Sequence, residues 1–334
     1  MKTLIIAEAG VNHNGDLGIA EQLIVKAAEG GADLIKFQSF LAEKMTLQGT
    51  EKAAYQKASS DTGSNQFEML KALELTREQH IQLLEKCKNQ GIGFFSSAFD
   101  LDSIEMLENL NFSQFVKVPS GELTNLPYLR KIARTKKQIL LSTGLCTLAD
   151  IENAIDIIEQ AGTSRNKITI LQCTSEYPAA IKDVNLHAML NMKATFGTQI
   201  GYSDHTLGIE VPIAAVALGA TVIEKHFTLD RKLPGPDHNA SLEPGEFAAM
   251  VKAIRNIESA LGDGIKRPSQ SELTNLVSIR KSIVAQKNIK VGEVFSETNL
   301  TTKRPGLGIS PMHWDQVLGQ RASRDFSKDE MIEL

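Results

Sequence analysis

Roughly the first 250 residues repeat one pattern, in which a short apolar run suited to a buried strand is followed by a stretch with helical periodicity. The apolar runs cover residues 3–7, 33–38, 92–95, 115–118, 138–141, 168–171, 198–202 and 220–223. Helical patterns separate or follow them, for example at 17–29, 78–88, 148–160, 209–218 and 244–261. Eight such units in a chain of this length predict a (β/α)8 TIM barrel. An open doubly wound sheet is the alternative, but no GxGxxG motif follows the first apolar run.

Two histidines follow the last two predicted strands. His205 comes shortly after the run 198–202, and His226 comes shortly after the run 220–223. If these strands are parallel neighbours, the crossover helix at 209–218 brings both histidines to the same edge of the sheet. The pair could hold a divalent metal with open coordination positions. The alternative is that both are hydrogen-bonded histidines at strand ends.

Two lysines lie inside apolar strands, Lys36 in 33–38 and Lys117 in 115–118. An ammonium removed from water is costly unless a negative charge lies beside it. Both lysines reach the same barrel mouth, so we expect an anion such as phosphate or carboxylate there. Small hydroxyl groups at neighbouring strand ends could complete its binding site: Ser97, Ser120, Ser142 and Ser203. Alternatively, each lysine pairs with a nearby acid such as Glu8 or Glu122.

Glu8 ends the first predicted strand, close to the expected lysines and histidines. It could act as a general acid or base or hold a substrate hydroxyl, and it could equally be the ion partner of a lysine. On the eighth strand, side-chain alternation places Glu224 on the same face as His226 and Lys225 on the opposite face. We therefore expect Glu224 to orient a metal ligand.

The bulk properties restrict the class of protein. A net charge of −4 and a pI near 6.0 argue against a nucleic-acid surface. Three cysteines without a CxxC pair favour a reducing compartment over a disulfide framework. The apolar segment at 3–7 is too short for a signal peptide, and that at 211–223 is too short to span a bilayer. We expect a cytoplasmic protein that is not bound to membranes.

Two segments depart from the repeating pattern. The polar segment 39–76 follows the second strand and would overhang the active face, where long loops are usually functional or mobile. After the barrel (1–261), glycine, proline and charge content predict a linker at 262–278. Residues 279–334 have the pattern of short strands and turns, including runs at 282–285 and 289–295. A module this small makes a poor core alone, so we expect it to dock on its own barrel or on a partner's.

The chain resembles the sialic acid synthase family over essentially its whole length. The motifs that carry the resemblance are GVNHNGD (10–16), IKFQSF (35–40), VKVPSGELTNLPYL (116–129), ILLSTG (139–144), YSDHTLG (202–208), IEKHFTLD (223–230), GPDH (235–238) and KRPGLG (303–308). The C-terminal module resembles antifreeze-like (SAF) domains. The family condenses phosphoenolpyruvate with N-acetylmannosamine or a related 2,4-diacetamido hexose, which gives a nine-carbon nonulosonic acid and phosphate.

The resemblance assigns roles to matching positions. It implies that His205 and His226 bind Mn2+ or a similar ion such as Mg2+ or Co2+, which polarises the sugar aldehyde. It places Lys36, Lys117 and the four serines around phosphoenolpyruvate, and it makes Glu8 the acid/base residue. Residues implied to line the sugar are Gln38, Tyr177 and Asp237. It also implies a domain-swapped homodimer, in which Arg304 enters the other protomer's barrel and binds the N-acetyl end of the sugar.

Some positions depart from the family pattern. Ser97-Ala98 replaces threonine-proline but keeps a hydroxyl, Ser175 closes an altered QCTS segment, and Leu307 replaces a usual asparagine. Two other functions stay open: a metal-dependent barrel aldolase or isomerase, and a non-catalytic carbohydrate-binding protein. Within the family, SDHTLGIEV and NIESALGDGIKRPS resemble legionaminic acid synthases slightly more than N-acetylneuraminate synthases.

Overall fold

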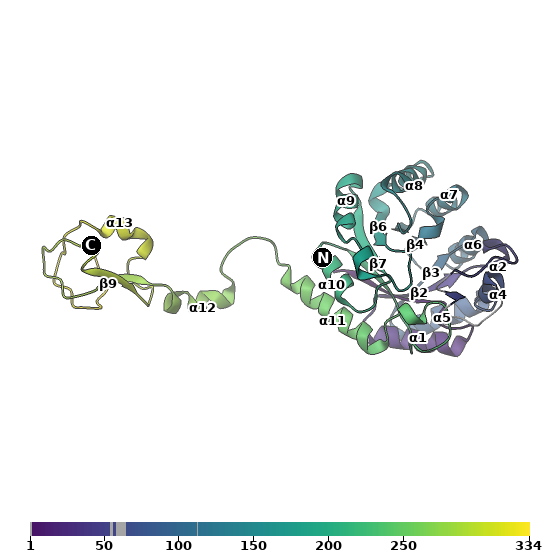
Figure 1. Ribbon diagram of the computed structural model, residues 1–334, viewed down its shortest axis with the longest axis horizontal. Helices are drawn as coiled ribbons and strands as arrows, with labels where there is room; N and C mark the ends of the chain where they lie inside the picture. The colour runs from purple at the N-terminus through teal and green to yellow at the C-terminus, as the bar shows by residue number, and fades with distance from the viewer. Residues whose placement is uncertain (1, 54–55, 58–64, 112) are drawn as a thin grey trace. The chain divides into compact units, whose positions relative to one another are not determined.

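The computed structural model describes residues 2–53, 56–57, 65–111 and 113–334. These form two compact units, Met1–Gly262 and Asp263–Leu334, shown in Figure 1. Part of the polar segment at 39–76, including Asp61 and Gly63, lies outside the described residues. In the part of the chain that is described, no helix combines the length and the apolar character needed to cross a bilayer.

The first unit is a barrel of eight parallel strands, which confirms the predicted TIM barrel. The strands are β1 (Leu4–Gly10), β2 (Leu34–Ser39), β3 (Gly93–Ala98), β4 (Phe115–Val118), β5 (Gln138–Ser142), β6 (Ile168–Cys173), β7 (Gln199–Asp204) and β8 (Val222–His226). Hydrogen-bonded neighbours run β3-β2-β1-β8-β7-β6-β5-β4. Phe95 of β3 and Phe115 of β4 are in edge contact across the remaining seam, with ring centroids 6.3 Å apart.

A helix follows each strand and lies outside the barrel (Figure 1). The main helices are α1 (Leu17–Glu29), α5 (Arg77–Gln90), α6 (Leu101–Leu110), α7 (Leu126–Arg134), α8 (Leu148–Gln160), α9 (His187–Phe196), α10 (Glu210–Ala217) and α11 (Pro244–Ala260). Local sequence fixes their ends. Asp16 accepts a hydrogen bond from the Ile19 amide at the start of α1, and Thr147 with Asp150 forms a capping box on α8. Apolar faces of these helices pack on the outward-facing strand residues to form the main cores.

The segment after β2 carries two short helices, α2 (Ala42–Met45) and α4 (Gln66–Lys71). They enclose a small apolar cluster of their own, in which Phe40, Met69, Leu70 and Leu73 pack against Val11 of the loop after β1. The described part of this segment is therefore a packed insertion beside the barrel mouth rather than a structureless loop.

The second unit begins with α12 (Gln270–Ile279) and continues with an antiparallel pair, β9 (Ser282–Ala285) and β10 (Leu300–Lys303). Further elements are α13 (Trp314–Val317) and 3-10 turns. A separate apolar core includes Ile283, Phe295, Leu300 and Phe326.

The structure adds detail to the C-terminal prediction at two places. The second half of the linker at 262–278 is helical, because Ser269 and Glu272 form a capping box at the start of α12. The run 289–295 is not a continuous strand. It makes isolated antiparallel bridges at Ile289 and Val294 instead.

Candidate functional site

Alternation along the strands builds a polar cavity over an apolar floor inside the barrel. The floor is the buried cluster Ile6, Phe95, Leu140, Leu171 and Val222. Two positions further along the same strands, and so on the same face, stand Glu8, Ser97, Ser142, Cys173 and Glu224. On β2 and β4, Lys36 and Lys117 likewise stand two positions after Leu34 and Phe115, which pack against the floor. The functional side chains therefore lie one layer above the floor, at the carboxyl ends of the strands.

These side chains line a cavity of about 460 Å³. Most residues predicted for the site border it: Glu8, Lys36, Gln38, Ser97, Lys117, Ser120, Ser142, Tyr177, Ser203, His205 and His226. Asp237 borders a smaller adjoining pocket together with Gln38, Tyr177 and His226. Arg304 belongs to the second unit, where its Nε donates a hydrogen bond to the Ile279 carbonyl at 3.0 Å.

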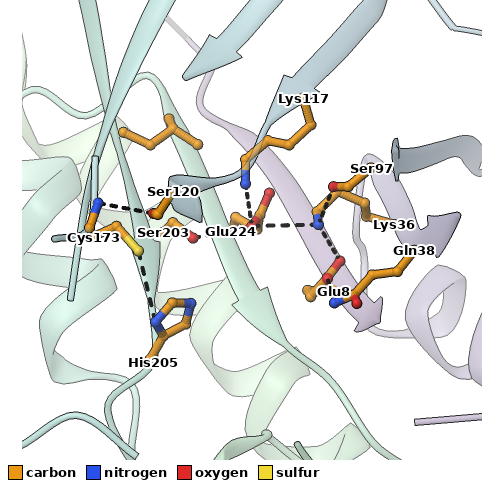
Figure 2. A network of polar contacts seen from close by, with 12 residues as sticks. Glu8, Lys36, Gln38, Ser97, Lys117, Ser120, Cys173, Ser203, His205 and Glu224 are labelled. Atoms are coloured by element: carbon orange, nitrogen blue, oxygen red, sulfur yellow. Dashed lines mark hydrogen bonds and ion pairs between the residues drawn. The ribbon is translucent and has the colours of Figure 1, made fainter. Parts of the chain in front are cut away.

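Two lysines and two glutamates form a buried cluster in this cavity (Figure 2). Lys36 Nζ lies 2.8 Å from Glu8 Oε2 and 3.7 Å from Glu224 Oε1. Lys117 Nζ donates to Glu224 Oε1 at 3.0 Å. Each lysine therefore has an acidic partner, as the alternative interpretation allowed. However, the partner of Lys117 is Glu224 and not Glu122, which accepts a hydrogen bond from Asn125 on the rim.

Glu224 Oε1 contacts Lys117, Lys36 and the Ser203 hydroxyl, whereas its Oε2 has no hydrogen-bond partner among the described residues, so its expected role in orienting a metal ligand stays a prediction. Burial alone would raise the pKa of this carboxyl, but the two ammonium groups outweigh it and lower the pKa to about 2.

Glu8 behaves in the opposite way. Burial raises the pKa of its carboxyl to about 7, although the Lys36 ammonium opposes the shift. Gln38 Nε2 donates to Glu8 Oε1 at 3.2 Å and keeps the side chain in the cavity. One carboxylate of the site is thus firmly ionised, and the other can gain or lose a proton near neutral pH. This division is typical of sites that carry out acid/base chemistry.

The four predicted serines all border the cavity. Ser97 accepts from Lys36 Nζ at 2.9 Å, and Ser120 accepts from the Gly144 amide at 2.9 Å. The Ser142 hydroxyl is buried and has no hydrogen-bond partner among the described residues. The two ammonium groups and these hydroxyls, of which that of Ser142 has no partner among the described residues, can together bind an anion that carries several oxygen atoms.

The two histidines face one another on adjacent strands, with ring centroids 5.4 Å apart. His205 Nδ1 lies 2.6 Å from the Thr174 carbonyl, which fixes a proton on that nitrogen, so Nε2 is the acceptor when the imidazole is neutral. His226 Nδ1 is buried without a hydrogen-bond partner among the described residues, and Asp237 Oδ2 lies 3.9 Å from it. Burial lowers the pKa of His226, so its imidazole is neutral, as a metal ligand must be.

These nitrogens fit a divalent metal that keeps most of its coordination positions open. No group of three or more histidine, cysteine, aspartate or glutamate side chains in metal-binding geometry occurs among the residues described. Tyr177 packs on the pair, with its ring 4.1 Å from that of His205. Cys173 Sγ lies 3.8 Å from His205 Nδ1 and also borders the cavity.

A buried ion pair behind the histidines was missed from sequence. Lys225 Nζ lies 2.5 Å from Asp204 Oδ2 and also donates to the Thr206 carbonyl, and both charged side chains are fully buried. The pair ties β7 to β8 on the face opposite the cavity. The β7–β8 register pairs Asp204 with Lys225, so the ion pair could have been predicted if this register had been known from the sequence.

The departures from the family pattern differ in location. Ser175 borders the cavity close to Gly144, whereas Leu307 is 69% exposed in the second unit.

Comparison with known proteins identifies the family. The NeuB family model matches residues 23–266, and the SAF domain model matches residues 280–333. The chain is 52% identical to an N,N'-diacetyllegionaminic acid synthase of Campylobacter jejuni over 99% of both chains. It is 46% identical to the synthase of the same name from Legionella pneumophila, over 98% of this chain and 92% of that protein.

A solved structure of a related enzyme has a similar fold. The N-acetylneuraminic acid synthetase of Leptospira borgpetersenii, crystallised with citrate, matches with a TM-score of 0.73 and 34% identity, over 82% of this chain and 90% of that one. The motifs, the barrel and these relatives lead to one conclusion: the chain belongs to the NeuB family of enzymes and carries a SAF domain at its C-terminal end.

Proposed function

We propose that this protein is a nonulosonic acid synthase, which condenses phosphoenolpyruvate with an N-acetylated amino sugar and releases phosphate. The preferred sugar is 2,4-diacetamido-2,4,6-trideoxymannose, and the product is then N,N'-diacetyllegionaminate; N-acetylmannosamine, which would give N-acetylneuraminate, is the second candidate. The observation that carries the proposal is the convergence of two ammonium groups, one near-neutral carboxyl and two histidines in a single cavity. The names of the two relatives quoted above support the choice of sugar.

Lys36 and Lys117 would bind the phosphate and carboxylate of phosphoenolpyruvate. Before the ligand arrives, Glu8 and Glu224 balance their charges, so neither ammonium is buried alone. A hydrogen bond from an ammonium to an anion contributes roughly 1.5–3 kcal/mol. The unpaired hydroxyl of Ser142 can donate to the same ligand.

Glu8 would move the proton of the reaction. C3 of phosphoenolpyruvate forms a bond to the aldehyde carbon of the sugar, and the aldehyde oxygen takes up a proton. Water adds at C2 of phosphoenolpyruvate, and phosphate leaves. A carboxyl with a pKa of about 7 can deliver that proton and recover it within the same pH range.

His205 and His226 would hold the divalent metal, with Mn2+ as the expected ion and Mg2+ or Co2+ as alternatives. When bound, the ion supplies Lewis-acid polarisation of the sugar aldehyde. The unpaired Nδ1 of His226 and the acceptor Nε2 of His205 support the assignment. Asp237 and Gln38 can orient the sugar hydroxyls beside them.

We propose further that the enzyme is a domain-swapped homodimer, in which each active site receives Arg304 of the partner subunit. The exposed Arg304 lies in a SAF domain with its own apolar core. Mixing Arg304→Ala protein with Glu8→Gln protein tests this, since one site of each mixed dimer recovers both groups if the arginine acts in trans. A mixture that stays inactive, although mixed dimers form, would refute it. Three free cysteines support cytoplasmic action.

Phosphate release by the purified protein tests the function. We expect release only when phosphoenolpyruvate, an amino sugar and a divalent ion are all present, and we expect Glu8→Gln to abolish it. Cleavage of a sugar without phosphoenolpyruvate would indicate an aldolase instead. Sugar binding without turnover would indicate a carbohydrate-binding protein.

A further inference from the structure

A second, smaller pocket opens beside the site, and its volume is about 150 Å³. We call it the annexe. It is lined by five apolar residues, Val11, Met45, Met69, Leu70 and Leu73, and by polar residues that include Gln38, Gln56 and Asp237. It adjoins the main cavity, because both are bordered by Gln38, Phe99, Tyr177 and His226. A ligand held at the histidines can therefore extend into it.

The walls of the annexe are preorganised. Val11, Met69, Leu70 and Leu73 are buried and belong to one apolar cluster with Phe40. Most of the cluster comes from the insertion after β2, which is packed and partly helical there. Met45, at the end of α2, is 38% exposed and lies at the outer side. This part of the pocket favours apolar groups of a fixed size.

The volume suits a small substituent. A single water molecule needs only about 10–15 Å³ of such space, so the annexe has room for a substituent of several non-hydrogen atoms. An acetamido group has four non-hydrogen atoms, and a methyl group has one. Methyl groups gain from leaving water, by a factor of about four in affinity for each carbon buried. The lining matches both parts of an acetamido group, since Gln38, Gln56 and Asp237 offer polar atoms to the amide and the five apolar residues contact the methyl.

We propose that the annexe binds the methyl-bearing C4–C6 end of the amino sugar and thereby selects a 6-deoxy, 4-acetamido sugar over one with hydroxyls at C4 and C6. This rests on the proposed function. The aldehyde carbon must stay beside Glu8 and the two histidines, and the C2 substituent next to it stays in the main cavity. The C4–C6 end is the part of the sugar far enough from the aldehyde to reach the annexe.

Two isosteric substitutions make the annexe polar without changing its size, Val11→Thr and Met45→Gln. Met106→Gln is the matched control, since Met106 is a half-buried residue of α6 that borders neither cavity. The measured quantity is the preference ratio, which is kcat/KM for 2,4-diacetamido-2,4,6-trideoxymannose divided by kcat/KM for N-acetylmannosamine, at saturating phosphoenolpyruvate.

We expect a wild-type preference ratio of at least about tenfold, which falls by about tenfold in Val11→Thr and in Met45→Gln and stays at the wild-type value in Met106→Gln. If Val11→Thr does not fold, the partly exposed Met45 decides the question. Unchanged ratios in the variants that fold, or a wild-type preference for N-acetylmannosamine, would overturn the inference and leave the synthase intact. Wild-type protein inactive with phosphoenolpyruvate and both sugars would overturn the proposed function, and the inference with it.

Discussion

Replacing Lys117 with methionine tests the assignment of the anion site. Lys117 is 4% exposed and donates a hydrogen bond to Glu224 Oε1 at 3.0 Å. Methionine keeps most of the length of the side chain and removes the charge. Glu224 retains Lys36 at 3.7 Å and the Ser203 hydroxyl at 3.1 Å, so its carboxylate is not left alone.

The structure sets the size of two separate effects. Breaking a buried ion pair by removing one partner costs about 3–5 kcal/mol of stability. Because Glu224 keeps its contacts with Lys36 and Ser203, we expect a cost of about 3 kcal/mol for Lys117→Met. Loss of one charge-assisted hydrogen bond to phosphoenolpyruvate costs roughly 1.5–3 kcal/mol of binding free energy. This predicts a Kd about 10- to 150-fold higher.

Isothermal titration calorimetry with phosphoenolpyruvate separates binding from stability, with thermal unfolding measured alongside. The matched control is Lys225→Met combined with Asp204→Asn, because Lys225 is equally buried but lies on the outer face of β8. We expect destabilisation in both proteins and loss of affinity only in Lys117→Met. Equal phosphoenolpyruvate affinities in the two folded variants would refute the anion-site assignment.

Three further predictions follow from the same geometry. His226→Ala should lower the affinity for Mn2+ by at least about tenfold in calorimetry. The control His238→Ala removes a buried histidine that is hydrogen-bonded to Thr228 and should leave the affinity unchanged. Equal Mn2+ affinities in the two variants would contradict the two-histidine site. Because burial raises the pKa of Glu8 from 4.5 to about 7, the folded protein holds a proton that the unfolded chain releases, so stability is lost as pH rises through this range. Between pH 4.5 and 7, the free energy of unfolding of the metal-free wild type, measured with urea, should therefore fall by about 3 kcal/mol more than that of Glu8→Gln. Parallel pH profiles of stability in the two proteins would contradict the raised pKa of Glu8. A Cβ at Gly144 would collide with the hydroxyls of Ser175, which borders the cavity, and of Ser120, which belongs to the anion site, whereas one at Gly121 meets nothing within 4 Å. Gly144→Ala should therefore weaken phosphoenolpyruvate binding and Gly121→Ala should not, and similar affinities would argue against the crowding.

The barrel was predictable from sequence because parallel strands buried on both faces have continuous apolar sequences. The bounds of β4 (Phe115–Val118), α1 (Leu17–Glu29) and α8 (Leu148–Gln160) agree with the predictions. The predicted ends of strands with polar terminal residues came too early, for example at 171 for β6 (Ile168–Cys173) and at 202 for β7 (Gln199–Asp204). The ladder of β7 continues to Asp204, because backbone pairing does not depend on the polarity of the side chains that enter the cavity.

Pairings between distant strands were harder to predict. Glu224 and Lys117 are 107 residues apart, and their contact depends on closure of the barrel, which strand patterns alone do not place in register. The alternation of side chains indicated the face of Glu224 but not its partner. The buried pair of Lys225 and Asp204 required the same β7–β8 register. The helix α12 was missed because the glycine and proline content upstream outweighed its capping box.

The mass of the product tests the central claim most directly. Purified protein would be incubated with phosphoenolpyruvate, 2,4-diacetamido-2,4,6-trideoxymannose and Mn2+, and the mixture would be analysed by mass spectrometry. We predict one new acid whose mass equals the sugar plus phosphoenolpyruvate plus water minus phosphoric acid, formed in equal amount to the released phosphate. Phosphate released without this acid, or neither product with this sugar or with N-acetylmannosamine, would contradict the account.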